Sequence, residues 1–171
     1  MNHSGKSSAL ADMLIGAAAG AAAIWVMDRV DWFNLKHEDP RARARTQAVR
    51  PGGMDPAHVI ADAGAHLLGR ELWPRQENAV GKGVHYALGT MSGALYGLLR
   101  HKVPGLTAGG GTLFSLGMFF VQDEGLNAVA GLSAKPKDYP WQAHARGFVA
   151  HAIYGLVLNA GLKLADGLRA R

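Results

Sequence analysis

Four apolar stretches, separated by polar segments, divide the chain. Their bounds are 9–27, 83–99, 106–121 and 142–165. A helix rises about 1.5 Å per residue, so stretches of roughly 16 to 24 residues reach about 24–36 Å, comparable with the ~30 Å hydrocarbon core of a bilayer. The pattern therefore predicts an all-α integral membrane bundle of about four transmembrane helices, formed by a single domain.

The first two apolar stretches are joined by the polar segment 28–82, which we expect to be mainly loop. Within it, Asp55-Pro56 offers an N-cap and a first-turn proline for a short amphipathic helix over 57–72. Three side chains follow at i, i+4 and i+8 on one face of that helix: His58, Asp62 and His66. This spacing could hold a divalent metal, but a plain polar stripe is the preferred interpretation, because the sequence offers no HExxH pattern and no clear further ligand.

Small residues recur every four positions in the second and fourth stretches, and both patterns end in Tyr-Gly. The residues concerned are Gly89, Gly93, Gly97, Gly147, Gly155, Tyr96 and Tyr154. Such a stripe lets helix backbones approach closely and predicts tight helix packing. A shift of 58 residues places Tyr96-Gly97 on Tyr154-Gly155. This match indicates either a duplicated helical hairpin or chance similarity between Ala/Gly-rich helices, and both remain open.

Ionisable residues gather at one face of the predicted bundle. Four antiparallel spans bring together the ends of the first and third helices and the starts of the second and fourth. The candidates for an ion or proton site are His85, Asp123, Glu124, His144 and His151, with Asp28 nearby. Ionisable groups at membrane depth are costly and by default mark function. The alternative is that these are helix-end groups that reach headgroups and water, and we prefer it for Asp28 and His144. His151 lies about 10 Å deeper in the predicted membrane than this face.

Composition narrows the choice of partners. Charged residues make up 18% of the chain, below the roughly 25% usual in soluble domains, and there are 23 glycines. The net charge of +5 favours anionic lipid headgroups over nucleic acid as a partner. The absence of cysteine excludes disulfides, thiolate catalysis and Cys-type zinc sites. Because the mean hydropathy is only +0.01, a soluble helical bundle also stays open.

Common enzyme motifs are missing from the sequence. It contains no Gly-x-Ser-x-Gly elbow, no phosphate loop and no dinucleotide fingerprint. The Gly-rich run Gly109-Gly110-Gly111-Thr112 lacks the lysine that a phosphate loop requires. We therefore predict neither an enzyme nor a bound cofactor.

The segment from about Gly83 to Leu164 resembles the YagU-type family of small bacterial inner-membrane proteins. The matching features are the histidine-led helix 85–96, the turn at Pro104, the Gly-rich helix from Leu106, the Pro140-Trp141 pair, and the last helix with His151 and Tyr154. The Gln122-Asp123-Glu124 cluster departs from the family pattern. The resemblance implies a multi-pass location in the bacterial inner membrane, and it implies no activity.

Three hypotheses follow. The leading one is a non-enzymatic inner-membrane protein that acts through helix packing, as a homo-oligomer or with another membrane protein, in envelope stress or pH response. The alternative is a small proton-, ion- or metal-coupled transporter or channel that uses His85, His151, Asp123 and Glu124. The second alternative is a soluble helical protein that binds a partner.

Overall fold

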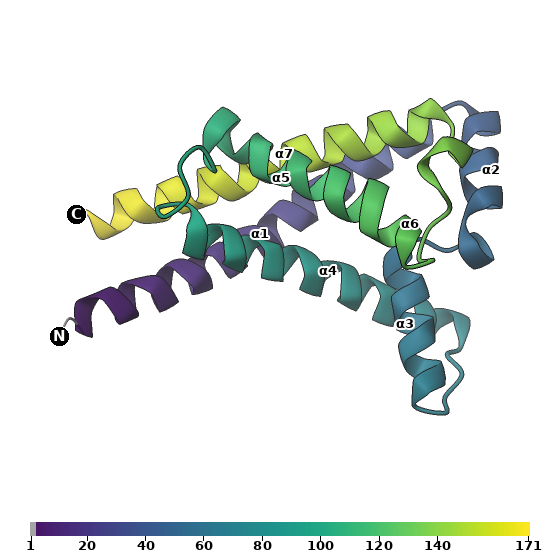
Figure 1. Ribbon diagram of the computed structural model, residues 1–171, viewed down its shortest axis with the longest axis horizontal. Helices are drawn as coiled ribbons and strands as arrows, with labels where there is room; N and C mark the ends of the chain where they lie inside the picture. Colours follow the sequence, from purple (N-terminus) through teal and green to yellow (C-terminus); the bar gives the residue numbers. More distant parts are fainter. Residues whose placement is uncertain (1–2) are drawn as a thin grey trace.

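The computed structural model describes residues 3–171 and shows only helices and turns in that range (Figure 1). The helices are α1 (His3–His37), α2 (Pro40–Val49), α3 (Pro56–Leu67), α4 (Pro74–Leu99), α5 (Thr112–Met118), α6 (Asn127–Val129) and α7 (Trp141–Arg169). A π-helical segment, Phe119–Leu126, connects α5 directly to α6. Short 3-10 turns occupy Pro51–Gly53, Ala108–Gly111 and Pro136–Asp138. The all-α prediction is confirmed.

α1 runs antiparallel to α4 and α7, which run in the same direction as each other (Figure 1). α1 packs against both α4 and α7, and α5 packs against α7. Both ends of the described chain lie at one end of the bundle, while α2 and α3 lie at the other (Figure 1). By length and composition, two helices are apolar enough to cross a membrane, Ala9–His37 and Trp141–Arg169.

The polar segment 28–82 is mostly helical, so its prediction as a loop is wrong. α1 continues to His37 because Asp28 and Asp31, which follow its apolar part, face partners on α4 and α7. α3 ends at Leu67, earlier than predicted, because Gly69 adopts a left-handed conformation (φ 66°) that ends a helix.

The predicted bounds of the third apolar helix are also wrong at both ends. Gly109, Gly110 and Gly111 have φ of 60°, 68° and 89°, a region that side chains other than glycine rarely adopt, so they form a turn before α5. At the other end the helical backbone runs through Asp123 and Glu124, which were expected to end it. It can continue because both carboxylates pair with histidines of α7.

Glycines bring the backbones of α1 and α4 into contact. A Cβ atom on Gly93 would lie 2.7 Å from the Cα of Gly20, and one on Gly97 would lie 3.0 Å from the Cα of Gly16. A Cβ on Gly89 would overlap the Ile24 side chain. Each of these contacts leaves no room for a side chain, which is the geometry that small residues every four positions allow.

Glycines of α7 also contact the glycine turn before α5 and the start of the π-helical segment after it. A Cβ on Gly155 would lie 2.8 Å from the carbonyl carbon of Gly111, and one on Gly147 would lie 2.7 Å from Cε2 of Phe119. The structure thus places the glycines of both predicted stripes at contacts between helices.

The two tyrosines of the sequence repeat cross-link α4 and α7. The hydroxyl of Tyr96 on α4 donates to Oδ1 of Asn159 on α7 at 2.8 Å. The hydroxyl of Tyr154 on α7 donates to the carbonyl oxygen of Gly89 on α4 at 2.6 Å. Both rings are buried with Ala23, Leu158 and Leu162, so their polar ends are satisfied inside an apolar core.

We expect Gly93→Ala to destabilise the fold by about 1–3 kcal/mol, the usual cost of overpacking a close contact. The matched control is Gly83→Ala in the same helix, where an added Cβ meets nothing within 4 Å. That control should be neutral or slightly stabilising, because alanine favours helix over glycine. Thermal unfolding followed by circular dichroism measures both, and equal melting temperatures for the two variants would contradict the tight α1–α4 contact.

Candidate functional site

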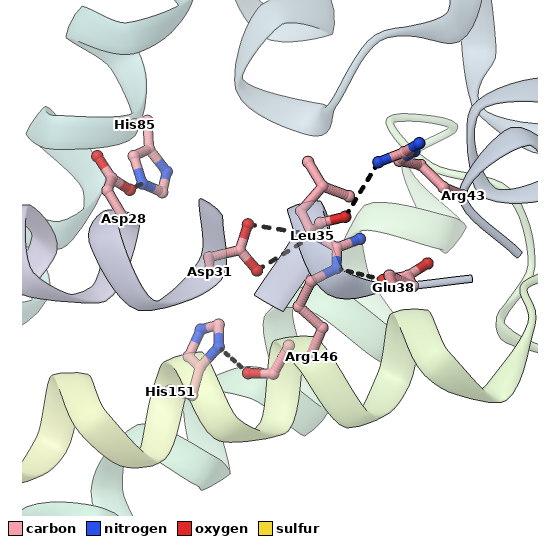
Figure 2. A network of polar contacts seen from close by, with 9 residues as sticks. Asp28, Asp31, Leu35, Glu38, Arg43, His85, Arg146 and His151 are labelled. Atoms are coloured by element: carbon pink, nitrogen blue, oxygen red, sulfur yellow. Dashed lines mark hydrogen bonds and ion pairs between the residues drawn. The ribbon is translucent and has the colours of Figure 1, made fainter. Parts of the chain in front are cut away.

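Charged side chains from four segments meet at the end of the bundle that carries α2 and α3, which we call the polar end, and Figure 2 shows those of α1, α4 and α7 around Arg146. They come from the second half of α1, the first halves of α4 and α7, and the π-helical segment. The residues are Asp28, Asp31, Glu38, His85, Asp123, Glu124, His144, Arg146 and His151.

Arg146 is the most extensively bonded cation of the polar end. Its Nη1 donates to both carboxylate oxygens of Asp31 at 3.1 Å, and its Nε donates to Oε2 of Glu38 at 3.0 Å (Figure 2). The side chains of Arg146 and Glu38 are only 10% and 5% exposed. The second oxygen of Glu38 is buried without a partner in the part of the chain that the structure describes. Arg146 therefore balances two carboxylates and ties α7 to the end of α1.

His85 pairs with Asp28 and links α4 to α1. Its Nε2 lies 2.9 Å from Oδ1 of Asp28, and both side chains are about one-third exposed. Figure 2 shows the pair beside the Arg146 cluster. The structure thus gives Asp28, expected only to reach solvent, a partner on another helix.

The hydrogen-bond partners of His144 show that its Nε2 carries a hydrogen. Its Nε2 lies 3.0 Å from the carbonyl oxygen of Pro136, which can only accept, so Nε2 carries a hydrogen. Its Nδ1 lies 2.7 Å from Oε1 of Glu124. His144 therefore joins α7 both to the π-helical segment and to the turn at Pro136.

His151 and Asp123 make a similar pair deeper in the bundle. Nδ1 of His151 donates to the carbonyl oxygen of Gly147 at 3.0 Å, and Nε2 lies 3.5 Å from Oδ2 of Asp123. Burial raises the pKa of Asp123, and the nearby charge of Glu124 adds to the rise, although His151 opposes it. The raised pKa means that the Asp123 carboxyl keeps its proton to higher pH in the folded protein than in the unfolded chain.

The π-helical backbone explains how two successive carboxylates can both face α7. An i→i+5 turn contains more residues than an α-helical turn, so neighbouring side chains point in more similar directions. Asp123 can then reach His151 while Glu124 reaches His144. No pattern in the sequence indicated this segment.

The three predicted metal-binding side chains of α3, His58, Asp62 and His66, do not come together as one group. His58 pairs with Asp55 at 2.8 Å and packs its ring against Gly81, whereas His66 lies 3.6 Å from Asp62 near solvent. Burial alone would raise the pKa of Asp55, but the hydrogen bonds from His58 outweigh it and hold that pKa below its usual value. In the described range no group of three or more such side chains could hold a metal ion.

The opposite end of the bundle, which we call the terminal end, carries a second charged cluster. The buried guanidinium of Arg100 donates to both carboxylate oxygens of Asp166, at 2.7 and 2.6 Å. Arg169 donates to Asp12 at 2.9 Å. These contacts join the start of α1, the end of α4 and the end of α7. Sequence reasoning missed this cluster and Arg146, although the lone Asp12 in an apolar stretch was a usable signal.

No family model, curated protein or solved structure matches this chain. The resemblance to the YagU-type family therefore stays a prediction, and the function has to be argued from the geometry.

We expect Arg146→Ala to destabilise the protein by about 3–5 kcal/mol, because it leaves Glu38 buried without a counter-ion. Arg169→Ala is the control at the other end of the same helix. Its side chain is 41% exposed, so removing its pair with Asp12 should cost less than about 1 kcal/mol. Chemical unfolding of both variants measures the difference, and similar losses would show that the Arg146 cluster contributes no more than a surface ion pair.

Proposed function

We propose that this chain is a non-enzymatic multi-pass membrane protein of four crossings that acts through helix packing. The observation that carries the proposal is an apolar band between the polar end and the terminal end. The third crossing starts as the glycine turn 106–111 and continues as α5, while the other three are 9–27, 83–99 and 142–165.

The band is almost free of charge. Between Asp12 and Asp28, α1 carries no charged residue over about 24 Å, and between His85 and Arg100, α4 carries none over about 22 Å. α7 has only His151 and Lys163 between positions 147 and 165. Side chains at either end can extend toward headgroups, which brings these lengths close to the ~30 Å core of a bilayer.

Large apolar side chains cover the outside of the band. They include Leu14, Met91, Leu95, Leu113, Phe120, Val121, Phe148, Val149 and Leu156. In the apolar windows of α1 and α7, only 28% and 33% of the residues are buried inside the protein, unlike the core helix of a soluble domain. Exposed apolar area costs about 25 cal/mol per Å² in water and nothing in lipid, which supports a bilayer as the surrounding medium.

Aromatic residues flank the band at the polar end, where an interfacial belt is expected. Trp25 and Trp32 are exposed on α1. The guanidinium of Arg29 lies 4.1 Å from the Trp25 ring, and the ammonium of Lys36 lies 3.4 Å from the Trp32 ring. Rings paired with cations in this way combine an apolar body with a polar edge and suit the headgroup region.

The finer parts of the proposal rest on the sequence. The resemblance of the segment 83–164 supports the bacterial inner membrane as the location. The exposed apolar faces of α4 and α7 leave room for a second copy or another membrane protein. The three histidine–carboxylate pairs at the polar end support a response to pH in the cell envelope.

Extraction of membranes with alkaline carbonate tests the location. We expect the protein to stay in the membrane pellet, while a peripheral marker protein is released. Release of the chain into the soluble fraction would overturn the proposal and favour a soluble partner-binding bundle.

Two charged variants sharpen the carbonate experiment. Phe148→Arg with Leu156→Arg places two charges on the outside of the band. Inserting an arginine at the centre of a membrane helix costs about 2.5–3.5 kcal/mol, so the amount of protein in the membrane pellet should fall several-fold. Leu67→Arg with Leu68→Arg adds the same charge at exposed positions beyond the band and should change little.

A second candidate function is proton transfer across the membrane. The observation that favours it is the set of three histidine–carboxylate pairs at one end: His144–Glu124 at 2.7 Å, His151–Asp123 at 3.5 Å and His85–Asp28 at 2.9 Å. Histidine and a buried carboxylate exchange protons near neutral pH, as a relay requires. His151 is the member that lies furthest into the band.

Liposomes containing the purified protein and a pH-sensitive dye test this second candidate. An imposed potassium diffusion potential should drive protons inward, and His151→Ala should lower that flux at least several-fold. His66→Ala, an exposed histidine on α3, is the control and should leave the flux unchanged. If the native protein shows no flux under any gradient, proton transfer is excluded and the packing function remains.

A further inference from the structure

Two arginines of α2 are left without partners at the polar end. Arg41 and Arg45 lie one turn apart on the same face of α2, and both are exposed. Neither side chain makes a hydrogen bond or ion pair with any residue that the structure describes. By contrast, Arg43 between them donates to the carbonyl oxygen of Leu35 at 3.3 Å (Figure 2).

These two arginines line an open groove between α2 and the start of α7. The groove is lined by Asp39, Arg41, Ala42, Arg45, Tyr139, Pro140, Trp141 and Gln142. Its only carboxylate, Asp39, already accepts from the backbone amides of Arg41 at 2.8 Å and Ala42 at 3.1 Å as the N-cap of α2. The groove therefore presents two free positive charges beside a tyrosine and a tryptophan.

An apolar stripe on α7 leads away from this groove into the band. It begins with Trp141, which is 72% exposed, and continues through Phe148, Val149 and Leu156. These positions recur at about seven residues, so they lie on one side of the helix, and the stripe extends about 22 Å. No charged residue lies on this stripe between Trp141 and Leu156.

We propose that the groove binds the phosphodiester headgroup of an anionic phospholipid, whose acyl chain lies along the α7 stripe. Guanidinium groups bind phosphate oxygens with charge-assisted, often bidentate hydrogen bonds. A zwitterionic lipid is less suited, because its ammonium group would lie near two arginines. The apolar stripe favours a lipid over a nucleic acid as the ligand, because a nucleic acid has no acyl chain that could lie along it. The inference rests on the proposed membrane location.

Native mass spectrometry of the detergent-purified protein tests the site with phosphatidylglycerol and phosphatidylcholine. The native chain should retain phosphatidylglycerol in preference to phosphatidylcholine. Arg41→Gln with Arg45→Gln should weaken phosphatidylglycerol binding about 30-fold, the effect expected from two arginines near an anionic headgroup. Helix content and melting temperature measured on the same samples show whether the variant is folded.

The matched control is Arg70→Gln with Arg75→Gln, which removes the same charge from exposed arginines near the exposed Leu68 and Trp73 but away from the groove. This control should change phosphatidylglycerol binding less than about twofold. If both double variants weaken it equally, the binding reflects overall charge, and the site is overturned.

Three further outcomes separate the possible sources of failure. Glycerophosphoglycerol, the headgroup without acyl chains, should not compete at equal concentration, and efficient competition would mean a site for a free phosphodiester. If carbonate releases the native chain from membranes, the membrane proposal itself fails. If the chain stays in the membrane but does not distinguish the two lipids, only the lipid site fails.

Discussion

The backbone contact between α1 and α4 is the constraint on which the remaining structure depends. Gly16 and Gly20 meet Gly89, Gly93 and Gly97 with no side chain between them, so the backbones of the two helices are in direct contact. This register brings Asp28 beside His85 at one end and Asp12 near Arg100 at the other. A larger residue at any of these glycines would separate both charged clusters as well as the helices.

The ends of the bundle, more than its middle, determine how α7 is placed. Arg146 joins α7 to Asp31 and Glu38 at one end, and Asp166 joins it to Arg100 at the other. The guanidinium groups of Arg146 and Arg100 are buried and costly without their partners, so these pairs specify the position of α7 along α1 and α4 more than they add net stability. In between, the Tyr96 and Tyr154 hydroxyls supply the directional contacts of an otherwise apolar interface.

The π-helical segment shows how structure and chemistry are linked at the polar end. A regular α-helix would point Asp123 and Glu124 in more divergent directions. The wider turn lets both reach histidines on one face of α7. The contacts that position the π-helical segment against α7 are therefore made by ionisable groups, so a change in their charge would act on helix packing directly.

The sequence by itself determined the helical class, the apolar stretches and the glycine positions suited to close contact, because each depends on the local order of residues along one helix. It also indicated which ionisable residues would gather at one end. Only the tertiary structure decided which carboxylate meets which histidine, that α1 continues to His37, and that the glycine run 109–111 is a turn. The pairings depend on partners 20 to 115 residues away, such as Glu124 for His144 and Asp31 for Arg146. A charged residue that would end a helix in isolation extends it when a distant helix supplies the opposite charge.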